Sequence, residues 1–283
     1  MKKKKVSRYV RFAHLALKMG EATLDKYSHR NSQKRYTQPQ LVAACLLGFY
    51  LNLSYRDLEE WLLASDKVCQ ALGLSEVPDH STLCRAFQRL RQSDLKQLNH
   101  WLMQKLNMEL TWVAVDATGY ILTQASHYYL TRTGQRMKHF WQGFYAVDLD
   151  TQYIVTWCEG IGPQGADVRF LNRLRQRIHR YGQLVGRREY ALLGDRGFDG
   201  DQALPTDFIT PKLGRYKVIR RQDRKQRADL TNMARLDGVM GRRWLIETVI
   251  SVIKRKSGAS IRSRRFMRQR REIGIKAIVY NLH

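Results

Sequence analysis

Long apolar segments are missing from this sequence. The longest candidate, residues 41–53, is interrupted by Gly48 and Asn52 and falls short of the ~18 consecutive apolar residues that a membrane helix needs. The basic start, residues 1–6, is not followed by the apolar stretch of a secretory signal. We therefore expect an intracellular, cytoplasmic protein that has no membrane partner.

Cysteine is also scarce, and its spacing excludes two kinds of site. Cys45, Cys69, Cys84 and Cys158 form no C-x-x-C pair and have no histidine at zinc-ligand spacing. Isolated cysteines of this kind are typical of small buried side chains in a reducing compartment. The sequence therefore predicts neither disulfides nor a zinc site.

Acidic residues are half as numerous as basic ones, 25 against 50, which gives a formal net charge of +25. Residues 1–36 carry +9 and residues 211–283 carry +16, whereas the segment between them is neutral. A positive charge excess of this size favours a polyanionic partner. Nucleic acid is favoured over an anionic membrane. The alternative, a basic surface that only keeps the protein soluble, is less favoured because solvated charge runs usually mix their signs.

Three segments differ in composition. Residues 1–36 form a basic N-terminal arm with a possible short helix over 9–19, which either follows a phosphate backbone or is a disordered tail. Residues 37–108 read as helical throughout. The helices expected here cover 39–51, 56–64 and 83–90, with Ser54 and either Asp79 or Ser81 as N-caps. Arginines at 85, 89 and 91 on the third helix would suit a DNA-binding bundle of the helix-turn-helix kind, although many helical bundles bind nothing.

Residues 109–283 alternate strands and helices. The strands expected from β-type composition and turn signals are 111–115, 144–149, 153–157, 189–193 and 205–210, with an amphipathic helix over 168–181. Asp116 and Asp195 each follow a strand, beside small residues. If the fourth strand lies parallel to the first, both aspartates reach the same edge of the sheet.

A third carboxylate lies on a helix predicted over 240–256. At about 100° per residue, Arg243, Glu247 and Lys254 share one face, and an apolar stripe forms the other. Glu247 could simply pair with Arg243 at i−4. It could also join the two aspartates, because Mg²⁺ prefers carboxylate oxygens held by rigid elements.

These motifs resemble those of the DDE transposases of bacterial and archaeal insertion sequences. The resemblance rests on Val-Asp-Ala-Thr-Gly around Asp116, on Gly-Asp-Arg-Gly-Phe-Asp around Asp195, and on a block similar to the Tyr-x2-Arg-x3-Glu-x6-Lys signature. Arg243, Glu247 and Lys254 stand in register with that signature. The resemblance implies an RNase H-like mixed sheet flanked by helices in residues 109–283, preceded by an all-helical DNA-binding module.

Two features depart from the family pattern. Met240 stands where the signature has tyrosine, and the 51 residues between Asp195 and Glu247 leave no room for the large β-insertion of some relatives. The basic segment 212–227, which includes Tyr216, is the candidate for any DNA contact that such an insertion makes; the alternative is a solvated loop.

The resemblance also implies an activity. Asp116, Asp195 and Glu247 would be the catalytic residues and would bind two Mg²⁺ ions, with Mn²⁺ as a possible substitute. The enzyme would cleave the terminal inverted repeats of an insertion sequence and join the freed 3′-hydroxyls to target DNA. Its partners would be double-stranded DNA and a second copy of the chain in a synaptic homodimer, on the nucleoid.

DNA contacts are expected from the same block. Arg243, Lys254, Arg255 and Lys256 would hold backbone phosphates beside the cut. Trp244 would either stack on an unpaired base or pack against the protein.

Three other functions compete with this one. A catalytically inactive DNA-binding derivative is disfavoured by the intact set of acidic residues. An enzyme that cleaves without joining uses the same carboxylates, so the sequence does not separate it from a transposase. An RNA-binding protein is less favoured because no aromatic sheet motif of the RRM type is present.

Overall fold

A computed structural model describes residues 6–122, 132, 140–162, 167–184, 190–213 and 219–283. The chain forms two compact units, and each is described by itself. The helical unit contains Met1–Leu102, Arg255–Gly258 and Ser263–His283, and the sheet unit contains Met103–Lys254 and Ala259–Arg262. The predicted linear division into 1–36, 37–108 and 109–283 stays a prediction.

The helical unit is built around one buried helix. Its helices are α1 (Arg8–Thr23), α2 (Gln38–Tyr50), α3 (Tyr55–Leu63), α4 (Asp66–Ala71), α5 (His80–Arg89), α6 (Gln92–Lys105, which ends in the sheet unit) and α11 (Phe266–Leu282). Helix α2 is buried along nearly its whole length because its sequence is apolar on every side. A capping box between Thr37 and Gln40 starts it, and α1, α5 and α11 pack against it.

Helix α11 comes from the far end of the chain but completes this unit. Asn281 Nδ2 donates a buried hydrogen bond of 2.8 Å to Asn99 Oδ1. Arg271 donates to the Gln88 carbonyl at 2.7 Å, and the Tyr50 hydroxyl lies 3.1 Å from His283 Nδ1. The first hundred residues therefore share a core with the last twenty.

The predicted helices of this unit are present, with caps at the expected residues. Ser54 accepts from the backbone N–H of Asp57, and Asp79 accepts from those of Ser81 and Thr82, so Asp79 rather than Ser81 begins α5. Helix α1 extends beyond the expected 9–19, and its buried side chains belong to the core.

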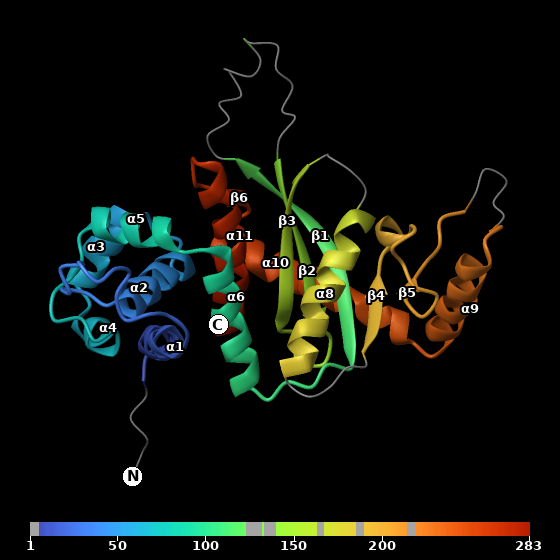
Figure 1. The fold of residues 1–283 in the computed structure, drawn as a ribbon, viewed down its shortest axis with the longest axis horizontal. Coiled ribbons are helices and arrows are strands. Elements are labelled where there is room, and N and C mark those ends of the chain that lie inside the picture. Colours follow the sequence, from blue (N-terminus) through green and yellow to red (C-terminus); the bar gives the residue numbers. More distant parts are fainter. Residues whose placement is uncertain (1–5, 123–131, 133–139, 163–166, 185–189, 214–218) are drawn as a thin grey trace. The chain divides into compact units, whose positions relative to one another are not determined.

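The sheet unit contains a five-strand path with the order β3-β2-β1-β4-β5. The strands are β1 (Trp112–Leu122), β2 (Phe140–Asp148), β3 (Ile154–Gly162), β4 (Ala191–Gly194), β5 (Phe208–Ile209) and β6 (Ser260–Ile261). Strands β1 to β3 are antiparallel; β4 and β6 lie parallel to β1, and β5 lies parallel to β4. The helices are α8 (Val168–Leu184), α9 (Gln222–Leu236) and α10 (Trp244–Ser257) (Figure 1). The last three residues of α10 belong to the helical unit. Two 3-10 turns, η1 (Arg196–Phe198) and η2 (Val239–Arg243), are also present. This mixed sheet flanked by helices confirms the predicted RNase H-like fold.

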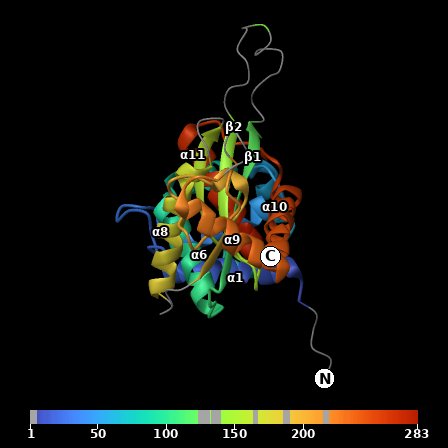
Figure 2. The same ribbon diagram turned by 90° about the vertical axis from the view of Figure 1, so that its right-hand side faces the viewer.

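The two faces of the sheet pack against different helices. Side chains alternate along β1, so Val113 and Val115 point to the face where the apolar stripe of α8 makes a buried core. The Phe144 and Phe170 rings stack there at 3.9 Å. Asp116 and Tyr120 point to the opposite face, and Figure 2 shows α8 and α10 on opposite sides of β1 and β2. Helix α10 therefore covers the face that carries Asp116.

Two expectations about the sheet unit were wrong in detail. Strand β1 does not end before Asp116 but continues to Leu122, because β2 pairs with it as far as Tyr120↔Trp141 and β6 pairs beyond that. Asp116 therefore lies in the middle of a strand. The predicted helix over 240–256 begins as the 3-10 turn η2, after Gly238 adopts a left-handed conformation with φ 74°. In the part of the chain that the structure describes, no helix is long and apolar enough to span a bilayer.

Candidate active site

The register between β1 and β4 brings two aspartates to the same level. Val115 is the Cα partner of Gly194, and the next residue on each strand is Asp116 or Asp195. Adjacent strands lie about 4.8 Å apart, and residues at the same level of a parallel pair point to the same face. The parallel pairing of β4 with β1, on which the expected placement of the aspartates depended, is present. The structure therefore places both aspartates side by side on the face covered by α10.

Asp116 lies in a buried and negatively charged environment. Burial is the main cause that raises the pKa of its carboxyl to about 6, and the charges of Asp195 and Glu247 contribute to this rise. A 2.8 Å hydrogen bond from the Ala117 N–H to Oδ1, and the charge of Arg243, act in the opposite direction. Carboxylates that repel one another in a partly dry site are neutralised by a proton or by a cation.

The turn after β4 fixes Asp195 and brings in an acidic residue that sequence reasoning missed. Asp195 Oδ1 accepts a 2.8 Å hydrogen bond from the Gly197 N–H within η1. A Cβ on Gly197 would lie 2.8 Å from Asp167 Oδ2 and 2.9 Å from Asp195 Oδ1, so only glycine fits here without displacing them. Burial and the charge of Asp195 raise the pKa of Asp167, and Lys212 opposes them. Asp167 directly precedes α8, and no local sequence motif marks its place beside Asp195.

Glu247 reaches the site from α10 and also makes the expected ion pair. Its Oε1 lies 2.7 Å from Arg243 Nη2, with 56% of the Glu247 side chain exposed. Glu247 is near enough to Asp116 to raise the pKa of that carboxyl. The ion pair that the sequence allowed is therefore present, and the role of Glu247 beside the two aspartates stays a prediction.

Lys254 marks the other end of the same helix face. Its Nζ lies 5.9 Å from the centre of the Tyr120 ring, and Tyr120 is itself hydrogen-bonded to Tyr145 at 2.6 Å between buried hydroxyls. Because Arg243 and Glu247 act on Asp116 while Lys254 lies at Tyr120, α10 runs along β1 in the direction of that strand. The predicted spacing of cations along one helix face is therefore present beside the candidate site.

The remaining predicted DNA contacts lie at the two ends of α10. Trp244 is the first residue of the helix, and 58% of its surface is exposed. This exposure does not fit the alternative in which Trp244 packs against the protein. Arg255 and Lys256 belong to the helical unit. Of the segment 212–227, residues 214–218 lie outside the described residues and Arg227 is fully buried, so the expected solvated or DNA-contacting run is wrong for Arg227.

The donors suit a hard divalent cation, although a closed metal site is not formed. Among the described residues, no three His, Cys, Asp or Glu side chains are grouped closely enough to hold one ion. Asp116, Asp195 and Glu247 nevertheless interact electrostatically and offer only carboxylate oxygens, the ligands that Mg²⁺ and Mn²⁺ prefer. The residues present therefore fit such an ion chemically, with Glu247 held by Arg243.

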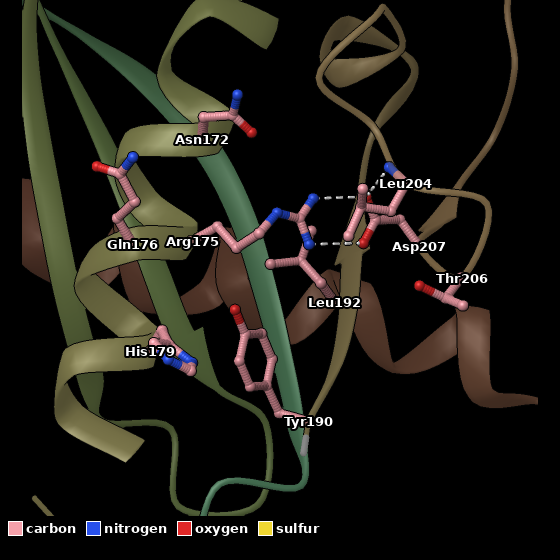
Figure 3. A pocket seen from close by; sticks show the side chains of 9 residues that line it. All are labelled: Asn172, Arg175, Gln176, His179, Tyr190, Leu192, Leu204, Thr206 and Asp207. Atoms are coloured by element: carbon pink, nitrogen blue, oxygen red, sulfur yellow. Dashed lines mark hydrogen bonds and ion pairs between the residues drawn. The ribbon is translucent and has the colours of Figure 1, made fainter. Parts of the chain in front are cut away.

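A pocket of about 550 Å³ lies elsewhere in the sheet unit, toward the amino end of β4 (Figure 3). Arg175 on α8 spans it and donates to Asp207 at 3.0 and 2.7 Å, and the Leu204 N–H donates to the same carboxylate at 2.7 Å. The pocket therefore contains the Arg175–Asp207 ion pair and none of the catalytic candidates.

An RNase H-like sheet with carboxylates at the same level of two neighbouring strands is an arrangement that suits metal-dependent phosphoryl transfer. Residues 109–282 match the family model described as a transposase DDE domain, and residues 3–89 match the transposase domain DUF772. The chain therefore belongs to the DDE transposases of the insertion-sequence type. Enzymes of this family act on DNA and generally use divalent metal ions.

A curated relative matches part of the chain. An uncharacterized protein of Aquifex aeolicus is 34% identical over 105 residues, which is 35% of this chain and 30% of that protein. The chain thus spans under a third of the length of the relative it matches, which carries no functional description of its own.

Proposed function

We propose that this protein is an active transposase that cleaves the ends of an insertion sequence and joins their 3′-hydroxyls to target DNA. The observation that carries the proposal is the level pairing of Asp116 and Asp195 on parallel strands, with Glu247 close enough to act on Asp116. The three residues are far apart in the sequence, and the charges of Asp195 and Glu247 act on Asp116 in the folded protein.

In this proposal Asp116, Asp195 and Glu247 hold two Mg²⁺ ions. Bound there, such ions would supply activation of a water or a 3′-hydroxyl and stabilisation of the charge that develops on the phosphate. The protein's own groups orient the ligands: the Ala117 N–H holds Asp116, the Gly197 N–H holds Asp195, and Arg243 holds Glu247. Such positioning matters because small displacements of catalytic groups cost large factors in rate.

Cations on α10 would hold the DNA backbone. We assign phosphate contacts to Arg243, Lys254, Arg255 and Lys256, which fix the register of the DNA without reading bases. Trp244 offers an exposed indole at the start of the same helix, where it can stack on an unpaired base.

Helix α5 is the candidate for reading the transposon ends. Its Arg85 donates to Ser81 Oγ at 2.8 Å, and Arg89 donates to Ser28 Oγ at 3.2 Å. Both arginines line a groove of about 560 Å³ beside residues 27–36, which also contribute Lys34 and Arg35. A capped helix that presents arginines next to a basic loop suits the major groove and its phosphates. Pairing two ends would require a synaptic homodimer on the nucleoid.

A plasmid assay tests the activity. A supercoiled donor carrying the ends of the element is incubated with Mg²⁺ or Mn²⁺, and nicked and linear products are measured. Asp116→Asn, Asp195→Asn and Glu247→Gln should each abolish cleavage, whereas binding to end DNA in a gel-shift assay stays within about threefold. Normal nicking by Glu247→Gln would contradict the assignment.

A second assay separates a transposase from an enzyme that only cleaves. Pre-cut ends with free 3′-hydroxyls are mixed with a target plasmid, and joined products are sought by gel and by sequencing. The proposal expects strand transfer that is lost in the three carboxylate variants. Cleavage without any joined products would show that the protein is a nuclease and not a transposase.

A further inference from the structure

Asp199, four residues beyond Asp195, is one partner of a buried ion pair. The carboxylate of Asp199 is completely buried. Asp199 accepts from Arg227 Nη2, and the two side chains have no exposed surface. The sequence could not show this because Arg227 lies 28 residues away, on α9.

Asp199 is also held by other segments. Its Oδ2 accepts a 2.7 Å hydrogen bond from the Lys212 N–H and lies 3.5 Å from Arg224 Nη2. Arg227 in turn donates to the Ala203 carbonyl at 3.1 Å and lies 3.7 Å from Asp223. The carboxylate therefore joins the turn after β4 to α9 and to the segment after β5.

The charge on Asp199 is needed for these contacts. A buried guanidinium has a high desolvation penalty unless an anion and hydrogen-bond acceptors surround it. An ionised carboxylate can accept from several donors at once, whereas an amide offers one oxygen and brings two donors of its own. Asp199→Asn therefore weakens the contact with Arg227 without changing the size of the side chain.

Only η1 separates Asp199 from Asp195. On its amino side Asp195 is fixed by β4, which pairs with β1 and β5. On its carboxyl side the chain has three residues before it is fixed again by Arg227. A shift of Asp199 therefore passes directly to the carboxylate that lies level with Asp116.

We propose that Asp199 and Arg227 are the positioning residues of Asp195, and that α9 thereby sets the geometry of the metal-binding carboxylates. This rests on the proposed function, in which Asp195 is a metal ligand. Neither side chain touches the ion or the DNA; both act through the η1 turn.

The same connection contains a matched control. Arg175 and Asp207 form a second ion pair, with 21% and 3% of their side chains exposed, at the far end of the β4–β5 connection (Figure 3). Asp207 is twelve residues from Asp195 and directly precedes β5, so its loss should destabilise the sheet unit without moving the η1 turn. Asp207→Asn thus reports the cost of a broken buried pair alone.

The experiment measures Mn²⁺ binding to the full chain by calorimetry in the absence of DNA, beside the urea unfolding of each variant. All comparisons are made at a temperature where each variant is folded. Asp199→Asn should weaken Mn²⁺ binding on the order of 10–100-fold, the usual effect of losing a residue that orients a metal ligand. Asp207→Asn should bind Mn²⁺ within about twofold of the wild type although it also unfolds in less urea.

Conservative variants keep the test decisive if Asp199→Asn does not fold. Arg227→Lys keeps the charge but not the paired donors, and should bind Mn²⁺ more weakly than wild type yet more tightly than Arg227→Gln. Wild-type Mn²⁺ affinity in a folded Asp199→Asn or Arg227→Gln protein would overturn the proposal, as would an equal loss in Asp207→Asn. If Asp195→Asn itself binds Mn²⁺ and cleaves normally, the proposed function is wrong. That result differs from normal Mn²⁺ binding by Asp199→Asn alone, which would contradict only the positioning role.

Discussion

At the scale of single residues, the site is dominated by carboxylates that lie closer together than charge repulsion favours. Asp116 is partly buried beside Asp195 and Glu247, and Asp195 shares the space around Gly197 with Asp167. Arg243 offsets part of this charge. The metal-free protein therefore stores electrostatic repulsion that a cation would relieve.

Replacing Asp116 should stabilise the metal-free protein at neutral pH. Because the pKa of Asp116 rises from 3.8 to about 6 on folding, the ionised group opposes folding above pH 6, and this cost disappears as the pH falls below the ordinary pKa. In EDTA at pH 7, Asp116→Asn should gain roughly 1–2 kcal/mol in the free energy of unfolding. The gain should shrink toward pH 4. Urea unfolding at several pH values measures it, and a loss of stability at pH 7 would contradict the described environment.

A methyl group on Gly197 should disturb the site and little else. The added Cβ would lie under 3.0 Å from oxygens of both Asp167 and Asp195, so these carboxylates must move. We expect Gly197→Ala to cleave DNA at least about tenfold more slowly, by analogy with the sensitivity of rates to misplaced groups. Gly241→Ala is the control because a Cβ there meets nothing within 4 Å. Equal activity of the two variants would show that the crowding at Gly197 is unimportant.

Candidate residues that stand in local motifs could be predicted from the sequence, whereas candidates that depend on tertiary contacts could not. Asp116, Asp195, Glu247 and Arg243 stand in short patterns whose spacing implies chemistry. Asp167 and Asp199 owe their roles to helices and turns brought near them by folding, and neither has a distinguishing neighbour in the sequence.

At the scale of elements, helix and strand types were predictable, but their ends depended on pairing. Apolar periodicity and capping residues located α2, α3 and α5 to within a few residues. Strand β1 exceeded its apolar run because β2 and β6 supply hydrogen-bonding partners for Thr118 to Leu122, which a single-strand pattern does not contain. The parallel pairing of β1 with β4, on which the expected placement of the aspartates depended, is present.

The N-cap of α5 should matter for both stability and end recognition. Hydrogen bonds from Ser81 and Thr82 hold the pKa of Asp79 well below its usual range, so this stabilisation is present above the usual pKa and is lost as the pH falls through the lowered value. Asp79→Ala should cost about 1 kcal/mol at pH 7 and should weaken binding to transposon ends that depends on Arg85 and Arg89.

Ser65 provides the control for this cap. It precedes α4 without a side-chain hydrogen bond, so Ser65→Ala should change neither the unfolding midpoint nor end binding. Thermal unfolding and gel-shift titrations measure both quantities. An equal effect of the two substitutions would indicate that the Asp79 cap contributes nothing.

At the scale of the whole molecule, the excess of positive charge bears on the proposed binding of DNA. A net charge of +25 predicts strong association that weakens steeply with salt, because bound phosphates release counterions. Lys254→Ala should reduce the slope of log affinity against log salt by about one if Lys254 contacts a phosphate. Lys67→Ala, exposed on α4, should leave the slope unchanged. If the Lys254→Ala and Lys67→Ala variants have the same slope, Lys254 does not contact a phosphate.

The two compact units do not follow one another along the chain. The helical unit takes its first six helices from the amino end and its last helix from the carboxyl end, with the sheet unit inserted between them. Asn99 and Asn281, or Gln88 and Arg271, are partners across most of the sequence. Such long-range closure could not be derived from local patterns.

This interleaving has a consequence for synthesis on the ribosome. The segment through α6 emerges first, yet its apolar surface on α2 stays uncovered until α11 has been translated, whereas every strand of the sheet is complete by Ile261. Biogenesis would then finish the sheet before the bundle that starts the polypeptide, and a premature stop codon just ahead of α11 would leave all three candidate carboxylates in a chain whose helical unit is unfinished.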